Sequence, residues 1–295
     1  MLQVVHVKII GNISLDGVPQ ERVVVLPDVE SLSLVMSDGE PGYKLAAHIS
    51  CPSAKQTSFT YEHEKDRDVM TPQETFPASV SWNAIVRQYT RSPVEEVALE
   101  MKISSDSIVE CSLEFRSPDA TVIRLHHALA GLDYEEYGDE SFKMLARVYW
   151  AVFSQVCRTI RGLTPSTNIK RLRICHTSPV FYRHQTTDEI AQLFESVGPL
   201  EELVLHRCDM EAYPASCPGY MRPVVFPPIK ELTISHPLRP LDFEAAMVVL
   251  AKSQHTLGLP FEHVTVRMDC LPTKMAERLR PWVGAVHCYN EVEPI

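Results

Sequence analysis

One short pattern of apolar residues recurs along this chain and limits what the chain can fold into. In "GPLEELVLHRC" (198–208), Leu200, Leu203 and Leu205 are apolar, and mostly polar residues lie between and after them. The same pattern starts at five other places, which are Val29, Val94, Ile169, Ile229 and Phe261. Alternating apolar positions over about five residues are typical of a β-strand that buries one face.

The last four copies of the pattern recur at a nearly constant interval. They begin at Ile169, Leu200, Ile229 and Phe261, which are 31, 29 and 32 residues apart. Helical patterns with one apolar stripe occur at 187–197, 242–254 and 272–282. A period of about 30 residues with a strand and a helix indicates a leucine-rich-repeat-like solenoid, because one repeat cannot bury its own apolar face. The alternative is an ordinary doubly wound α/β domain, which also alternates strands and helices.

The first half of the chain is less regular. Residues 51–62 predict a degenerate strand, residues 81–91 a helix, and residues 104–125 two strands joined by turns, as in an antiparallel hairpin. The longest helix is predicted at 141–163. We therefore predict one leucine-rich-repeat-like α/β domain over residues 1–295, with a mainly parallel sheet and helices on its outer face. Its repeats are irregular over 1–140 and regular over 141–295.

Charge and composition exclude several classes of protein. The formal net charge of −10 opposes binding to phosphate backbones, so we expect no nucleic-acid partner. The eight cysteines show no zinc-site or CxxC spacing, and scattered thiols of this kind are typical of a reducing compartment. The apolar start "MLQVVHVKII" lacks a cleavage site, and no apolar run is long enough for a membrane span. We expect a cytoplasmic or nuclear protein without a membrane partner.

The motifs of common enzymes are absent from the sequence. There is no GxG, GxxxxGK[ST], GxSxG or HExxH, and no EF-hand loop. We predict no catalytic, cofactor-binding or metal-binding residues and no enzyme activity. Because enzymes without these motifs exist, an α/β enzyme with an unrecognised site stays open as the alternative.

Three clusters were weighed as possible sites of chemistry. They are His206 with Cys208 and Cys217 as metal ligands, His126 and His127 with Asp133 as a base and its partner, and His287 with Cys288 as a thiol–imidazole pair. The first has no common zinc spacing, and adjacent residues on a strand point to opposite faces. A structural role is therefore favoured for all three clusters.

Three longer runs of the sequence resemble the large basidiomycete F-box protein family. They are "FEAAMVVLAKSQHTLGLPFEHVTVRMDCLPTKMAERLRPWVGAVHCYNEVEP" (243–294), "SVSWNAIVRQYTRSPVEEVALE" (79–100) and "LPDVESLSLVMSDGEPGYKLAAHISCPSA" (26–54). The resemblance implies leucine-rich-repeat-like repeats that hold a protein substrate, and an F-box that docks to the adaptor of a cullin–RING ubiquitin ligase. This sequence shows no F-box-like "LPxE…I" segment. We therefore expect adaptor binding only if an upstream F-box exists in a longer protein; a repeat scaffold without ligase coupling is the other possibility.

The sequence pattern also predicts where a protein partner binds. Residues that alternate with the apolar positions of the regular strands point away from the core. Arg171 and Arg173 should share one side, with Glu202 and His206 on the same face of the next strand. The predicted partner-binding residues are Arg171, Arg173, Glu202, His206, Glu231, His263 and Arg267. Their mixed charges favour a protein partner, although a merely solvated face is the plainer interpretation.

Overall fold

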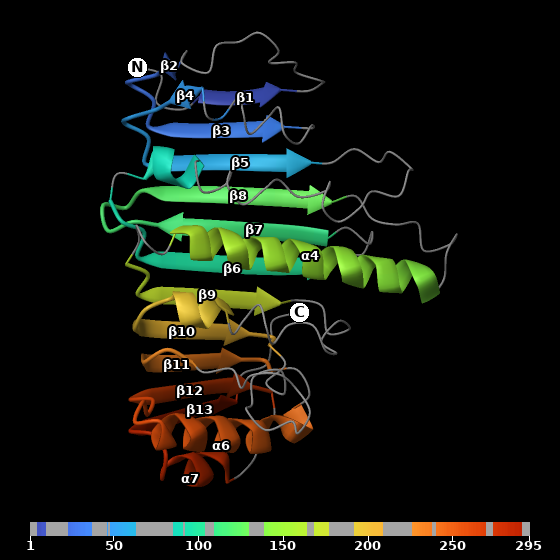
Figure 1. Ribbon diagram of the computed structural model, residues 1–295, viewed down its shortest axis with the longest axis vertical. Helices are drawn as coiled ribbons and strands as arrows, with labels where there is room; N and C mark the ends of the chain where they lie inside the picture. The colour runs from blue at the N-terminus through green and yellow to red at the C-terminus, as the bar shows by residue number, and fades with distance from the viewer. Residues whose placement is uncertain are drawn as a thin grey trace. The chain divides into compact units, whose positions relative to one another are not determined.

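The computed structural model of the chain divides into two compact units, residues 1–167 and residues 168–295. Figure 1 labels the helices and strands of both units. The structure describes residues 5–9, 23–36, 46, 48–62, 85–90, 92–103, 109–129, 139–163, 168–176, 192–208, 226–237, 240–269 and 274–290. The single domain expected over residues 1–295 stays a prediction.

The first unit contains a six-stranded sheet. Its strands lie in the order β1 (Val5–Ile9), β3 (Ser31–Met36), β5 (Gln56–Glu62), β8 (Val122–Leu129), β7 (Val109–Arg116) and β6 (Glu96–Ile103). Neighbouring strands are parallel from β1 to β8, whereas β7 is antiparallel to both β8 and β6. The predicted strand at 51–62 and the predicted hairpin at 104–125 are therefore confirmed. A separate parallel pair is formed by β2 (Val24–Val25) and β4 (Ile49–Ser50).

Alternation of apolar and polar residues gives this sheet one buried face. In β7, Val109, Cys111, Leu113 and Phe115 are buried, and the residues between them are partly exposed. The long helix α4 (Asp139–Leu163) packs against β7 and buries Tyr149, Val152, Val156 and Ile160. The guanidinium of Arg87 donates a 3.0 Å hydrogen bond to the carbonyl of Gly162 and so satisfies a free carbonyl at the end of α4. The helix predicted at 141–163 is confirmed.

A tight turn joins β7 to β8. The amide of Ser117 donates to the carbonyl of Thr121 at 3.0 Å, and the amide of Ala120 donates to the carbonyl of Ser117 at 3.1 Å. Ala120 has φ of 64°, which is the left-handed conformation that a three-residue hairpin loop requires at its last position. The Asp119 carboxylate accepts a hydrogen bond from the amide of Thr121 and helps to fix the turn.

The second unit contains five parallel strands. They are β9 (Arg171–His176), β10 (Leu200–His206), β11 (Ile229–Ser235), β12 (His263–Met268) and β13 (Ala285–Asn290), in that order across the sheet. Leu172, Leu203, Leu232 and Val264 are direct neighbours in register, and each is buried. The prediction of four adjacent parallel strands with one stacked apolar column is confirmed.

Helices cover the buried face of this second sheet. Residues 192–196 are helical within the predicted 187–197, whose first residues lie outside the described ranges. Helix α6 (Pro240–Thr256) buries Phe243, Met247 and Leu250, as its apolar stripe predicts. It begins at Pro240, two residues before the predicted start of the pattern at Asp242; proline suits the first turn because it has no amide to satisfy.

Helix α7 (Met275–Leu279) is shorter than the predicted 272–282. It buries Met275 and Leu279, and Arg278 bonds Glu244 of α6 at 3.0 Å. Trp282 lies beyond the end of this helix, where Pro281 interrupts the pattern.

The observed architecture is thus mixed α/β with mainly parallel sheets. No helix in the described ranges combines the length and the apolar character that a membrane crossing requires.

Candidate functional site

The predicted partner-binding residues lie on one face of the β9–β13 sheet. We call this the open face; it carries the outward residues that alternate along each strand with the buried apolar column. In β9, for example, Arg171 and Arg173 are exposed and Leu172 and Ile174 are buried. The prediction that the two arginines share a side follows directly from this pattern and is confirmed.

The register of the strands divides the open face into three rows. The first row crosses the sheet near the start of the strands and contains Arg171, Glu202, Glu231 and His263. Neighbours in a row are about 4.8 Å apart in backbone position, so the arginine lies beside two successive carboxylates. Glu202 and His206 lie on the same face as Arg171 and Arg173, as predicted, but only Arg171 has a carboxylate as its neighbour on β10.

The second row is less charged in its centre. It contains Arg173, Val204, Thr233, Thr265 and His287, again as direct neighbours in register. Arg173 on β9 and His287 on β13 lie at the two ends of this row. Arg173 therefore neighbours an apolar residue rather than a carboxylate within its row.

The third row crosses the carboxyl ends of the strands. It contains Cys175, His206, Ser235, Arg267 and Tyr289. The guanidinium carbon of Arg267 lies 5.7 Å from the centre of the Tyr289 ring, a distance typical of a cation–π contact. The Tyr289 side chain is 50 % exposed, which makes it one of the most exposed large apolar side chains in the described residues.

Two residues just beyond the third row adopt an unusual backbone conformation. Arg207 follows β10 with φ of 53°, and His236 follows β11 with φ of 47°. Their amides continue the inter-strand hydrogen bonds, to the carbonyl of Ser235 at 2.9 Å and to that of Arg267 at 2.8 Å. Positive φ is uncommon for residues other than glycine and costs of order 1–2 kcal/mol per residue.

The side chain of His236 connects neighbouring strands at this edge. Its ring meets the ring of His206 edge-on at 5.6 Å, and its Nδ1 lies 3.5 Å from a carboxylate oxygen of Asp269. We call the set His206, His236, Arg267, Asp269 and Tyr289 the carboxyl-end cluster. Sequence reasoning found His206 and Arg267 but missed the other three residues. Extending the alternation from His287 would have placed Tyr289 on the open face.

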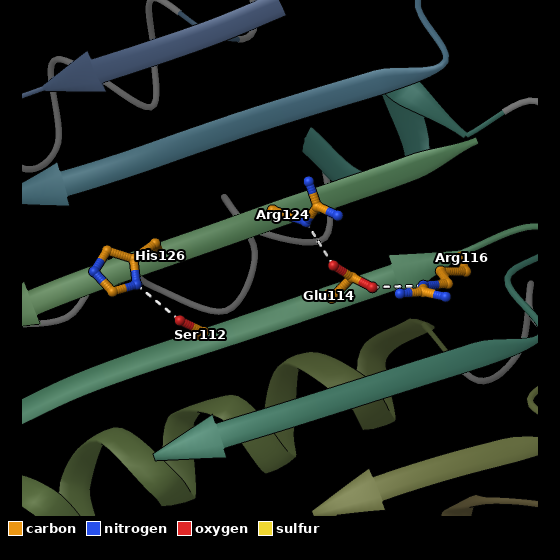
Figure 2. A network of polar contacts seen from close by, with 5 residues as sticks. All are labelled: Ser112, Glu114, Arg116, Arg124 and His126. Carbon is orange, nitrogen blue, oxygen red and sulfur yellow. Dashed lines mark hydrogen bonds and ion pairs between the residues drawn. The ribbon is translucent and has the colours of Figure 1, made fainter. Parts of the chain in front are cut away.

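The outward face of the first unit carries a second polar network (Figure 2). The Glu114 carboxylate on β7 accepts hydrogen bonds from Arg116 of the same strand and from Arg124 of β8, both at 2.5 Å. Partial burial opposes ionisation of Glu114, but the bonds from Arg124 and Arg116 outweigh it and lower the pKa of this carboxyl. Because Glu114 faces Arg124 directly in register, the network ties β7 to β8.

Ser112 and His126 form the other contact in Figure 2. The Ser112 hydroxyl lies 2.8 Å from Nδ1 of His126, and the two residues are direct cross-strand neighbours. Nucleophilic catalysis would also need a group that orients the imidazole and donors for a developing oxyanion. The position of this pair in a sheet row is that of a cross-strand hydrogen bond, so we assign it a structural role.

Two of the three candidate clusters lie only partly within the described residues. Cys208 is buried, and its sulfur contacts the carbonyls of Ile174 and His206. His126 is the cross-strand neighbour of Ser112, whereas the adjacent His127 is the neighbour of Cys111, so the two histidines occupy successive positions of β8. Cys217 and Asp133 lie outside the described residues. Among the residues that are described, no three His, Cys, Asp or Glu side chains form a possible metal site.

The last of these clusters is split by the alternation of β13. His287 is exposed and faces outward, whereas Cys288 is half-buried beside it. Burial raises the pKa of the Cys288 thiol, which disfavours the reactive thiolate.

Comparisons with known proteins return no match: no family model, no curated protein and no solved structure is similar to this chain.

Proposed function

We propose that this protein is a non-enzymatic protein-interaction module that binds a partner on the open face. The supporting observation is that all seven predicted residues lie on one face of four adjacent parallel strands, β9 to β12, in continuous register. Such a sheet presents a broad, preorganised row of side chains for each strand, which lowers the entropic cost of binding a large surface. The first row contains both an arginine and two glutamates, and this mixed charge suits a protein partner better than a polyanion.

We also propose that the chain is a leucine-rich-repeat-like solenoid. Leu200, Leu203, Leu205 and Cys208 match the L-x-x-L-x-L-x-x-C spacing that is typical of such repeats. The cysteine sulfur contacts the carbonyl of Ile174 on the neighbouring strand, so this position helps to hold adjacent repeats together. The stacked apolar column and the roughly constant repeat length further support the proposal.

A more specific part of the proposal is a role in ubiquitin ligation. Following the resemblance to basidiomycete F-box proteins, the repeats would hold the substrate of a cullin–RING ligase in the cytoplasm or nucleus. A pull-down with purified adaptor tests the ligase link separately from partner binding. We expect these 295 residues not to retain the adaptor, because none of them resembles an F-box. Stoichiometric retention would contradict that expectation.

The partner surface is tested by reversing its basic residues. The double variant Arg171→Glu with Arg173→Glu should fold normally, since exposed substitutions usually change stability by less than about 0.5 kcal/mol each. It should lose the partners that the wild-type chain captures from basidiomycete lysate, because like charges then face each other across the interface. The matched control is Lys55→Glu with Arg158→Glu, which makes the same charge change at two exposed positions of the first unit. Unchanged capture by a well-folded Arg171→Glu, Arg173→Glu variant would remove this face as the binding site.

A further inference from the structure

The open face is chemically uneven along the direction of its strands. Its two glutamates, Glu202 and Glu231, lie in the first row. The third row lies four residues further along each strand, which corresponds to about 13 Å. Toward those carboxyl ends, the described open-face residues include Arg173, Arg267 and three histidines, with Asp269 as their single carboxylate. With histidine counted as neutral, the two arginines outnumber the one carboxylate, so this region is less acidic than the chain as a whole, whose formal net charge is −10.

The basic side chains are spread across strands and do not converge on one point. Arg173 is on β9, Arg267 is on β12 and His287 is on β13. Arg173 and Arg267 are three strand spacings apart, or about 14 Å. One phosphate group binds tightly where several donors meet at one place. Donors separated in this way instead suit a chain that carries several anions, such as an extended peptide whose alternate side chains are about 6.8 Å apart.

The carboxyl-end cluster adds a rigid contact surface to this charge. Arg267 and Tyr289 are held against each other, and His206 packs edge-on against His236. An exposed aromatic ring beside a guanidinium provides apolar contact area together with a charge, a combination enriched at binding hot spots.

Two residues at the carboxyl ends of β10 and β11 have a backbone conformation that is unfavourable for residues other than glycine. Arg207 and His236 have positive φ, although glycine adopts this conformation at no steric cost. Strained conformations of this kind cluster at functional sites, where the strain is retained because the side chain is needed. His236 has such a use, because its ring joins His206 to Asp269.

We infer that the carboxyl-end cluster, together with Arg173 and His287, binds an extended acidic segment of the partner protein through its Asp and Glu carboxylates. This inference rests on the proposed function and names the chemistry that the open face recognises. The acidic first row would then exclude the same segment from the opposite end of the strands and so fix its position on the face.

The direct test is binding of a short fluorescein-labelled peptide with glutamate at alternate positions and alanine between them, measured by fluorescence anisotropy. Two further peptides are measured for comparison. The first has glutamine in place of every glutamate and is therefore neutral. The second has the sequence of the glutamine peptide with one residue replaced by phosphoserine. We expect the glutamate peptide to bind, to weaken as salt is raised, and to exceed both other peptides by about tenfold or more. Equal binding of the glutamine peptide, or tighter binding of the phosphoserine peptide, would overturn the inference.

Three variants locate the binding within the fold. Arg267→Glu should weaken binding of the glutamate peptide by about tenfold or more, whereas Arg158→Glu, an exposed position on α4, should leave it unchanged. His236→Gly should weaken binding without lowering the unfolding temperature, because glycine suits the observed φ of 47°. Equal affinities of the wild type and Arg267→Glu would contradict the assignment of the cluster.

The inference and the proposed function fail in different ways. If lysate partners are lost on reversal of Arg171 and Arg173 but the wild type does not bind the glutamate peptide, only the acidic-segment inference is wrong. If the glutamate peptide binds and Arg267→Glu abolishes its binding, while the Arg171 and Arg173 reversal still captures every lysate partner, the cluster binds acidic segments but the open face is not where those partners bind, and the proposed function is wrong.

Discussion

At the scale of single residues, Thr57 is a polar side chain inside an apolar column. It stands between Leu32 and Ile123 in register, it is buried, and its hydroxyl has no hydrogen-bond partner. A buried polar group without a partner costs about 1–3 kcal/mol relative to a satisfied one. We expect Thr57→Val, which keeps the shape and removes the hydroxyl, to raise the free energy of unfolding by about 1–2 kcal/mol.

Urea unfolding of the Thr57→Val variant measures this effect. The matched control is Thr60→Val on the same strand, at a half-exposed position of the opposite face, which should change stability little. A loss of stability in Thr57→Val would mean that its hydroxyl is satisfied in solution.

His176 makes the stability of the protein depend on pH. It is buried at the end of β9, and desolvation lowers its pKa from 6.5 to about 3. Between these two values the unfolded chain binds one more proton than the folded chain, so stability falls as the pH is lowered from 6.5 toward 3. The expected slope is up to about 1.4 kcal/mol per pH unit.

Urea unfolding at pH 7 and pH 5 measures the His176 contribution. His176→Phe removes the titrating group, so the variant should lose less stability than the wild type between these two pH values. Identical pH dependence of the two proteins would show that His176 is accessible to protons in the folded state.

Which face a residue occupies was predictable from the sequence, because alternation along a strand is local. Arg171 and Arg173 were placed correctly for this reason. The neighbours across β9 to β12 were predictable as well, because the nearly constant repeat length aligns Leu172, Leu203, Leu232 and Val264. The contact of His236 with His206 beyond the strand ends was not, because it depends on a turn that carries no such period. The left-handed conformations of Arg207 and His236 were also missed, because arginine gives no signal for positive φ and histidine, although enriched there, adopts other conformations far more often.

At the scale of elements, the β7–β8 turn places a residue with a Cβ where glycine is favoured. Ala120 adopts φ of 64° at the last position of the loop. Glycine would remove the steric cost of this conformation, which is of order 1 kcal/mol, although it also makes the unfolded chain more flexible. We expect Ala120→Gly to raise the unfolding temperature or leave it unchanged.

The control for the turn is a strand position of the same sheet. Ala98→Gly in β6 has no positive φ to relieve and should lower stability by roughly 0.5–1 kcal/mol. If Ala120→Gly destabilises the protein as much as Ala98→Gly does, the turn does not have this conformation in solution.

Strand positions were predicted better than helix ends. The same pattern of three apolar residues marks each of β9 to β12, either within the strand or beginning just before it, and this pattern fixes the place of each strand within a few positions. Helix ends depend on one or two capping residues. Where two residues both favour a helix end, the sequence does not decide between them, and the predicted ends of α6 and α7 differ from the observed ones. In α6, Asp242 is a residue type that favours a helix start, but the helix begins earlier, at Pro240, which suits a first turn. In α7, the helix ends at Leu279, before Pro281, so Trp282 is not part of it.

At the scale of the whole molecule, contacts between neighbouring strands are a main source of the stability of the second unit. The buried column Leu172, Leu203, Leu232 and Val264 connects four parallel strands of the second unit through direct neighbours. In stacked repeats, each repeat contacts only the next ones, so its stability is close to a sum of nearest-neighbour terms. A defect in one strand should therefore act mainly on the strands beside it.

Leu203→Ala tests this behaviour, because Leu203 is fully buried between Leu172 and Leu232. The deletion should lower the free energy of unfolding by about 2–5 kcal/mol, through lost apolar contact and the cavity left behind. Hydrogen exchange should show the largest loss of protection in β9, β10 and β11 and a smaller loss in β13. Val204→Ala, on the open face of the same strand, is the control and should cost less because Val204 is only half-buried. Equal loss of protection in all five strands would show that the second unit unfolds as one cooperative block, and a change near zero would show that Leu203 is not in the core.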